Sequence, residues 1–304
     1  MLEAFIDKLK HDSFLTLETT PMHEPTFDPI IDKIEAFGLQ HHFDGFSTTD
    51  NPLARLKFNA LFGALKLQSR FNKPVIATMS MRDRNKVALQ SDLLGANEFN
   101  LRTILCLTGD PASASDQPSV KGVFEGNSTL LMDMIHCFNA GIDYSGKPFK
   151  TQPKTIYPFA VCNAHANTPR HLMKKMANKI NHGAIGIITQ PVYSVENATM
   201  LLDLLKDAKR EINKEHNEAQ LILGFFPIVK LRTAQFLAAH VPGIHVPSLW
   251  MDKLTEAKKI SEEEEKKVGF ELSLQTFLEL KKVHPKIHMM GANNFELVAD
   301  LLKY

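Results

Sequence analysis

Eight short apolar runs, separated by longer amphipathic stretches, constrain the fold of this chain more than any other feature. Strands that alternate with helices form right-handed βαβ units and a parallel sheet. Eight such units in 304 residues favour an α/β fold of the (β/α)8 TIM-barrel type over an open sheet. We therefore predict one barrel domain spanning residues 1–304, with strands at 14–17, 45–48, 75–79, 104–107, 156–161, 186–189, 221–226 and 287–290.

The composition excludes several classes of protein. With 35 basic and 34 acidic residues, the net charge of +1 gives no sign of a nucleic-acid or membrane partner. Three cysteines without paired spacing, Cys106, Cys137 and Cys162, argue for a reducing compartment. The sequence has no CxxC or HExxH zinc motif, no secretory signal and no apolar run of about 18 residues. We expect a cytoplasmic protein without a metal.

Two connections between the expected strands are unusually long. Residues 111–126 are rich in Ser, Ala, Asp and Pro and are typical of a functional loop at the active face of a barrel. Residues 242–285 contain the sequence SEEEE at 261–265, where Ser261 suits a helix N-cap and the glutamates suit the helix dipole. We interpret this acidic run as the solvated start of a final long helix.

Two carboxylates follow or end expected strands, where barrels carry their chemistry. Glu18 has apolar neighbours, and desolvation there would raise its pKa and make it a general acid near neutral pH; the alternative is a helix-capping or salt-bridging glutamate. Asp110 ends the fourth strand in LTGDP, and its alternative is a simple Asx turn. Asp50, before Asn51 and Pro52, is interpreted as a helix cap, while Thr49 can donate to a ligand.

Three further polar residues lie at candidate site positions. His165 follows the fifth strand, and a loop histidine bonded to backbone is the alternative to a ligand contact. Lys179 falls in the last turn of a helix, where its charge already suits the dipole. Gln190 ends the sixth strand and offers both a donor and an acceptor for a heterocyclic amide edge. Because the GxGxxG and GxxxxGK[ST] fingerprints are absent, any nucleotide cofactor is expected at the barrel mouth.

Seven short motifs occur in one order along nearly the whole chain. They read ETTP, STTDNP, RDRN, LTGDP, ITQPVY, GFFPIVKLRTAQFL and VPGIHVPSLW. In this order they resemble the flavin-dependent methylenetetrahydrofolate reductases of bacterial type. The resemblance implies FAD bound at the C-terminal ends of the strands, reduction of 5,10-methylenetetrahydrofolate by NAD(P)H in one-carbon and methionine metabolism, and a possible homo-oligomer or association with another one-carbon enzyme.

The resemblance also assigns roles to individual residues. Glu18 corresponds to the proton donor, Asp110 to the aspartate between flavin and pterin, and Gln190 to the substrate-contacting glutamine. The positions implied to contact flavin are Thr49, Thr78, Thr108, Gly109, Asp110, Phe124, His165 and Lys179.

Several positions depart from the pattern of the family. Thr78 stands where a histidine is usual, and Thr108 replaces an arginine of some members. Leu172 occupies a position that is acidic in some members, and Asn294 replaces a folate-binding arginine of some members. The departures at Thr78 and Asn294 motivate an alternative, a catalytically altered or partner-dependent barrel that binds flavin or one-carbon carriers. A barrel aldolase would need a Schiff-base lysine at a strand end, and no expected strand ends on one.

Overall fold

Eight parallel strands close into a barrel in the order β1 to β8 in this computed structural model, which describes residues 1–304 except Asn167 and Pro242. The expected TIM barrel is confirmed, and every expected strand is found within two residues at either end. Pro242, with which the second long connection was expected to begin, lies outside the described residues. The strands are β1 Phe14–Thr19, β2 Gly45–Thr48, β3 Val75–Ser80, β4 Thr103–Leu107, β5 Tyr157–Cys162, β6 Gly186–Pro191, β7 Gln220–Phe225 and β8 Lys286–Met289.

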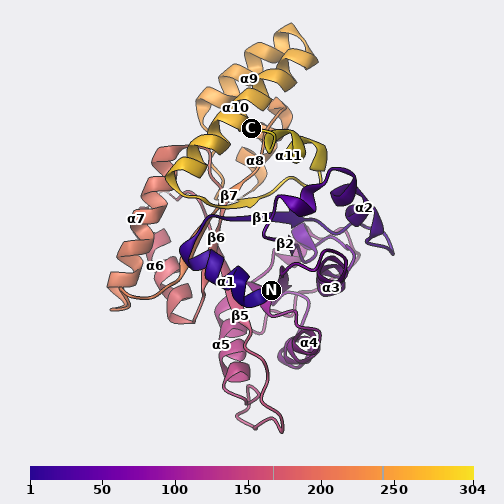
Figure 1. Ribbon diagram of the computed structural model, residues 1–304, viewed down its shortest axis with the longest axis vertical. Helices are drawn as coiled ribbons and strands as arrows, with labels where there is room; N and C mark the ends of the chain where they lie inside the picture. Colours follow the sequence, from indigo (N-terminus) through magenta and orange to yellow (C-terminus); the bar gives the residue numbers. More distant parts are fainter. Residues whose placement is uncertain (167, 242) are drawn as a thin grey trace.

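The outer layer consists of the helices that connect these strands (Figure 1). Their apolar faces pack on the outward-facing residues of the strands in one large core, as the amphipathic pattern predicts. The α-helices are α1 Leu2–His11, α2 Asp28–Ala36, α3 Ala60–Phe71, α4 Lys86–Glu98, α5 Ser128–Asn139, α6 Pro169–Asn181, α7 Val195–Glu211, α8 Leu231–His240, α9 Ser248–Ile260, α10 Glu262–Val283 and α11 Phe295–Leu301.

Helix α1 closes the N-terminal end of the barrel. Its buried residues Leu2, Phe5, Ile6 and Leu9 form a second core with inward-facing residues of six strands. The fit is close at Gly45, the first residue of β2, because a Cβ atom there would lie 2.7 Å from the Phe5 ring. A plugged N-terminal end leaves the C-terminal end of the barrel as the face for ligands.

Helices α9 and α10 form a hairpin that projects beyond the barrel at the top of Figure 1. Ser261 caps α10 as expected, since its side chain accepts a hydrogen bond from Glu264 N. The acidic run is only partly solvated, however. Glu265 is buried, and its carboxylate accepts the backbone N–H of Leu231 at 2.8 Å, at the start of α8. The interpretation of the whole run as solvated is therefore wrong at Glu265, which holds α8 against α10.

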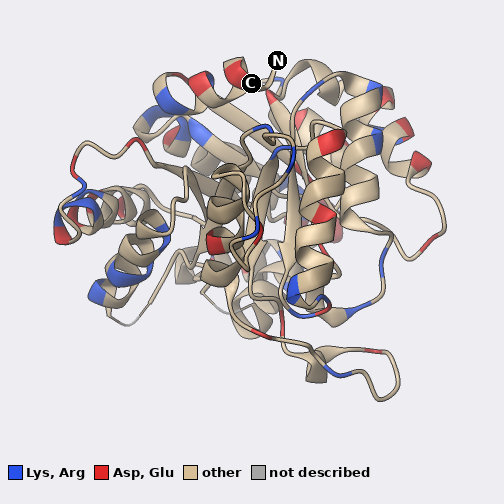
Figure 2. Cartoon of the chain, turned by 90° about the horizontal axis from the view of Figure 1, so that it is seen from below, with Lys and Arg blue, Asp and Glu red and all other residues tan. Residues whose placement is uncertain are grey.

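Basic and acidic residues are intermixed over the outer helices (Figure 2). This distribution agrees with the nearly balanced charge of the sequence. Among the described residues, no helix is both long enough and apolar enough to cross a bilayer.

Candidate active site at the barrel mouth

Polar side chains from several strands meet at the open, C-terminal end of the barrel. Glu18 lies in β1, Thr49 directly follows β2, Asp110 follows β4 and Gln190 lies in β6. The parallel register places the C-terminal ends of these strands on one rim, since Glu18 pairs with Ser47 and Thr49 donates its N–H to Thr19 O. The structure thus brings the four residues to one end of the barrel.

Glu18 points toward the barrel interior with 22% of its side chain exposed. Its Oε2 atom lies 3.8 Å from Nε2 of His288 on β8. Glu18 lies inside a strand and bonds no helix N–H among the described residues, so the helix-capping alternative is not observed. A carboxyl group that is largely screened from water yet open to the mouth is suited to proton transfer.

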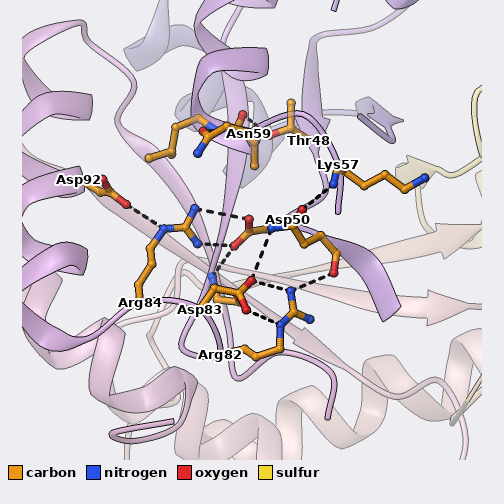
Figure 3. Close-up of polar contacts among 12 residues, drawn as sticks. Thr48, Asp50, Lys57, Asn59, Arg82, Asp83, Arg84 and Asp92 are labelled. Atoms are coloured by element: carbon orange, nitrogen blue, oxygen red, sulfur yellow. Dashed lines mark hydrogen bonds and ion pairs between the residues drawn. The ribbon is translucent and has the colours of Figure 1, made fainter. Parts of the chain in front are cut away.

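Asp50 does not cap a helix, contrary to the interpretation from the sequence. The segment after it forms only a short 3-10 turn, η2 at Pro52–Ala54, and α3 begins later with Asn59 as its cap. Asp50 is buried and accepts the backbone N–H of Ser80 at 3.0 Å and the Arg84 guanidinium at 2.7 Å (Figure 3). Its carboxylate therefore ties the end of β2 to the end of β3 and the RDRN segment.

Arg84 has a second acidic partner, Asp92 of α4, at 2.8 Å (Figure 3). Burial opposes the charge of Arg84, but Asp50 and Asp92 outweigh it and raise the pKa of the guanidinium. The contribution of this ion pair to stability depends on both partners being present, because an unpaired buried charge is costly.

We expect Arg84→Met to lower the free energy of unfolding by about 3 kcal/mol, because it leaves the buried Asp50 carboxylate without its counter-ion. Chemical denaturation measures this loss. The matched control is Lys206→Met, which removes an exposed ion pair with Asp203 and should cost less than about 1 kcal/mol. Equal losses in the two variants would show that Asp50 does not need the arginine.

The segment after β2 is strained. Asn51, Leu53 and Ala54 have positive φ values of 44°, 56° and 56°, each costing of order 1 kcal/mol in a residue other than glycine. Two contacts hold this conformation: Asp110 accepts the Leu53 N–H at 2.6 Å, and Arg82 donates to Asn51 O at 3.0 Å. Asp110 thus does more than form its own turn, since it bridges the end of β4 to the loop after β2.

Gly109 is required beside this contact. Its φ of +96° disfavours any residue with a side chain, and a Cβ atom there would lie 2.8 Å from Arg82 Cβ. Arg82 itself is buried with 3% of its side chain exposed and forms two hydrogen bonds with Asp83, at 2.7 and 2.8 Å. Asp83 raises the pKa of Arg82 through these bonds. The RDRN segment is thereby fixed under the rim.

The loop at 111–126 lies beside the end of β3. Val123 donates its N–H to Arg82 O at 2.7 Å, and Phe124 donates to Met81 O at 3.1 Å. Phe124 adopts a positive φ of 41° and keeps 37% of its surface exposed. The expected active-face loop is therefore found, with an exposed aromatic ring at the mouth.

The N-terminus of α5 forms a second polar corner of the rim. Ser128, its first residue, donates its N–H to Thr108 Oγ1 at 3.1 Å, and its hydroxyl accepts from Nζ of Lys179 on α6. Lys179 lies between the helices and the outer face of β4 and β5, and burial lowers the pKa of its amine. A helix N-terminus beside an ammonium group is suited to a phosphate.

Gln190 lies at an irregularity in the sheet. The register between β6 and β7 shifts between Ile188 and Pro191, and Thr189 Oγ1 accepts the N–H of Gly224 at 2.9 Å. Gly224 must lack a side chain, because a Cβ atom would lie 2.2 Å from Thr189 O. Bulges of this kind redirect side chains next to active sites. His165, after β5, stacks on His245 with ring centroids 4.9 Å apart.

The positions that depart from the family pattern have plain structural roles. Thr78 is buried in β3 opposite Leu105, a residue of the interior core, and so faces the barrel interior. Leu172 is buried in α6. Asn294 caps α11 by accepting the N–H of Leu297.

Two hydroxyl oxygens at the mouth are buried without a hydrogen-bond partner among the described residues. They belong to Thr49, after β2, and Ser80, the last residue of β3. Buried polar atoms are nearly always paired in native proteins. Two orphaned hydroxyls at neighbouring strand ends therefore fit a ligand with polar atoms, such as the rings of a flavin or a pterin.

The described residues hold no group of three or more His, Cys, Asp or Glu side chains placed to bind a metal. Burial raises the pKa of the Cys106 and Cys162 thiols to about 12, so neither is a thiolate nucleophile at neutral pH.

Sequence reasoning did not assign roles to His288, Ser80 or the Asp50–Arg84 pair. The RDRN motif identifies the two arginines, but the sequence does not show which residues form ion pairs with them. The pattern at 287–290 predicts a buried strand. A histidine among its apolar residues was the sign in the sequence that His288 has a polar partner, because buried polar groups are nearly always paired.

Comparison with known proteins identifies a family over nearly the whole chain. A family model described as methylenetetrahydrofolate reductase matches residues 6–304, and no curated protein matches the sequence significantly. One similar solved structure is an uncharacterized protein from Clostridium thermocellum that binds two copies of 5-methyl-5,6,7,8-tetrahydrofolic acid; the TM-score is 0.63 at 16% identity, covering 99% of this chain and 97% of that one. Another is an F420-dependent secondary alcohol dehydrogenase in complex with an F420-acetone adduct, with a TM-score of 0.57 at 12% identity and coverage of 96% and 97%. At these identities the two structures support the fold alone.

Proposed function

Because this chain belongs to the methylenetetrahydrofolate reductase family, we propose that it reduces 5,10-methylenetetrahydrofolate to 5-methyltetrahydrofolate with NAD(P)H and bound FAD, in the cytoplasm. The observation that carries this proposal is the convergence of Glu18, Asp110 and Gln190 on one barrel mouth, beside two unpaired buried hydroxyls. The solved structure of the same fold that binds a methylated folate is consistent with a folate ligand at this mouth.

The residues present fit FAD. Thr49 and Ser80 offer unpaired hydroxyls to the polar atoms of a ring system. Thr108, Ser128 and Lys179 offer a helix N-terminus and an ammonium group to a diphosphate. The other residues proposed to hold the cofactor are Gly109, Phe124, Thr78 and His165. Gly109 contributes by lacking a side chain, and Phe124 contributes an exposed ring. FAD, when bound, supplies the hydride transfer.

The chain itself handles the folate and one proton. Glu18 gives its proton to the folate, which opens the five-membered ring to an iminium ion. Asp110 stabilises the positive charge that develops there, an electrostatic effect that a fixed carboxylate supplies well in a site shielded from water. Gln190 offers an N–H donor and a carbonyl acceptor to the amide edge of the pterin. Together these contacts would hold the reacting carbon in place for reduction.

We expect the purified protein to be yellow, with flavin absorption bands that bleach under anaerobic NADH or NADPH and return on addition of methylenetetrahydrofolate. Absorption spectroscopy with each nicotinamide tests this directly and identifies the preferred donor. A protein that stays colourless after incubation with FAD would instead support the alternative, a partner-dependent barrel that binds one-carbon carriers without catalysis.

A further inference from the structure

A buried histidine lies directly beneath Glu18 inside the barrel. His288 is the third residue of β8, and its neighbours in the sheet are Thr16 of β1 and Gly224 of β7. It is 1% exposed. Thr16 and Glu18 alternate on the same face of β1 and so both point inward.

The hydrogen bonds of the ring indicate its tautomer. Nδ1 of His288 lies 2.7 Å from Thr16 Oγ1, and the Thr16 hydroxyl has no other hydrogen-bond partner among the residues described. If Nδ1 carried the proton, the buried hydroxyl hydrogen would be left unpaired, which is costly. The contact with Thr16 is the shorter of the two that the ring makes with hydroxyls, and a proton on Nε2 faces the Glu18 carboxyl group, so we assign Thr16 as the donor to Nδ1. A neutral ring then carries its proton on Nε2.

That Nε2–H faces the mouth. It lies 3.4 Å from Ser47 Oγ and 3.8 Å from Glu18 Oε2. Glu18 is the only carboxylate within 4 Å of the ring among the described residues. Below the ring lies the apolar core against α1, and Lys286, two residues earlier in β8, directs its ammonium to Asp12 O. No other charged group of the described residues competes for this N–H.

We propose that His288 is a positioning residue for Glu18, with Thr16 fixing its tautomer. The Nε2–H holds one carboxyl oxygen of Glu18 toward the interior and leaves the other for the folate. When Glu18 has given its proton to the folate, the same N–H stabilises the carboxylate that remains. The present distance of 3.8 Å is long for a hydrogen bond, and contacts of this kind shorten when the substrate binds. The kinetic consequence of this inference rests on the proposed function, whereas the tautomer of His288 does not.

The kinetic test separates the two half-reactions in anaerobic stopped-flow experiments. A hydrogen bond to a charged group is worth about 10- to 100-fold in rate, so His288→Leu should slow the folate half-reaction by that factor and leave flavin reduction by NAD(P)H unchanged. His288→Gln keeps an N–H near the Nε2 position and should recover most of the rate. Thr16→Val should also slow the folate step, and Thr16→Ser, which restores the hydroxyl, should rescue it.

The matched control is His284→Gln, because His284 is a half-buried histidine whose ring bonds Leu221 O near the N-terminal end of β8. It should leave both half-reactions within about twofold of wild type, well below the loss of one catalytic hydrogen bond. If His288→Leu slowed both half-reactions equally, and the control His284→Gln did the same, His288 would act only through packing and the proposal would be overturned.

A spectroscopic test needs no activity. Long-range ¹H–¹⁵N NMR of the histidine rings in the purified protein, assigned by loss of one signal set in His288→Gln, should show the Nε2–H tautomer at His288. Glu18→Gln should shift these signals, and Thr16→Val should mix the two tautomers. An Nδ1–H tautomer, or signals indifferent to Glu18→Gln, would overturn the inference even in an active reductase. If the wild-type protein reduced no methylenetetrahydrofolate, the proposed function would fail while this measurement still decided the role of His288.

Discussion

Glu18→Gln should nearly abolish reduction of methylenetetrahydrofolate and leave flavin binding and NAD(P)H oxidation intact. Glutamine keeps the size of the side chain and most of its hydrogen bonds but cannot give up a proton as an acid does. Opening of the folate ring needs that proton, whereas hydride transfer from nicotinamide to flavin does not. General acids contribute about 100- to 10,000-fold, so we expect a loss of this order confined to the folate half-reaction.

Stopped-flow mixing of the reduced protein with methylenetetrahydrofolate measures this loss, and mixing of the oxidised protein with NAD(P)H measures the unaffected step. Glu265→Gln is the control, because Glu265 is a buried glutamate that accepts the Leu231 N–H at the start of α8, away from the strand ends. A wild-type rate of folate reduction in Glu18→Gln would show that another group supplies the proton.

The barrel could be predicted from the sequence because buried strands have apolar residues in short local runs. The second strand was expected at 45–48 and is found at Gly45–Thr48; the ends of the other strands differ by at most two residues. The third helix was less well predicted. The interpretation of Asp50 as a cap placed the start of a helix near Pro52, yet α3 begins at Ala60. Asn51, Leu53 and Ala54 are instead at positive φ, in a loop that contacts the ends of β3 and β4.

The site was predictable where position along a strand was enough, and not where a role depends on a distant partner. Glu18, Asp110 and Gln190 could be placed at the mouth because parallel strands share one C-terminal end. Asp50 was interpreted as a cap, since Asp before Asn-Pro often begins a helix, but its partner Arg84 is 34 residues away. His288 and Thr16 are 272 residues apart, and no local pattern relates them.

Substitution of Asp110 is the second change that should have a large effect on the rate of folate reduction. It accepts the Leu53 N–H at 2.6 Å, and it lies near enough to Arg82 to contribute to the raised pKa of that guanidinium. The hydrogen bond from Leu53 fixes the position of this carboxylate. A carboxylate fixed in this way needs no rearrangement to stabilise a positive charge that develops in the bound folate, and such preorganised charges account for much of enzymatic rate enhancement.

We expect Asp110→Asn to slow the folate half-reaction by about 100-fold, the usual loss for one preorganised electrostatic group, and to slow flavin reduction by NAD(P)H far less. Asparagine still accepts the Leu53 N–H through its side-chain oxygen, so the strained loop should persist and the loss of rate should reflect the loss of charge.

Asp83→Asn is the matched control. This aspartate lies in the same cluster, but its carboxylate is engaged by Arg82, and its loss should leave the folate step within a few-fold of wild type. The two half-reactions, measured separately by stopped-flow absorbance, decide the matter. Equal slowing of both in Asp110→Asn would mean that Asp110 shapes the mouth through the loop after β2 and does not act on the charge of the folate.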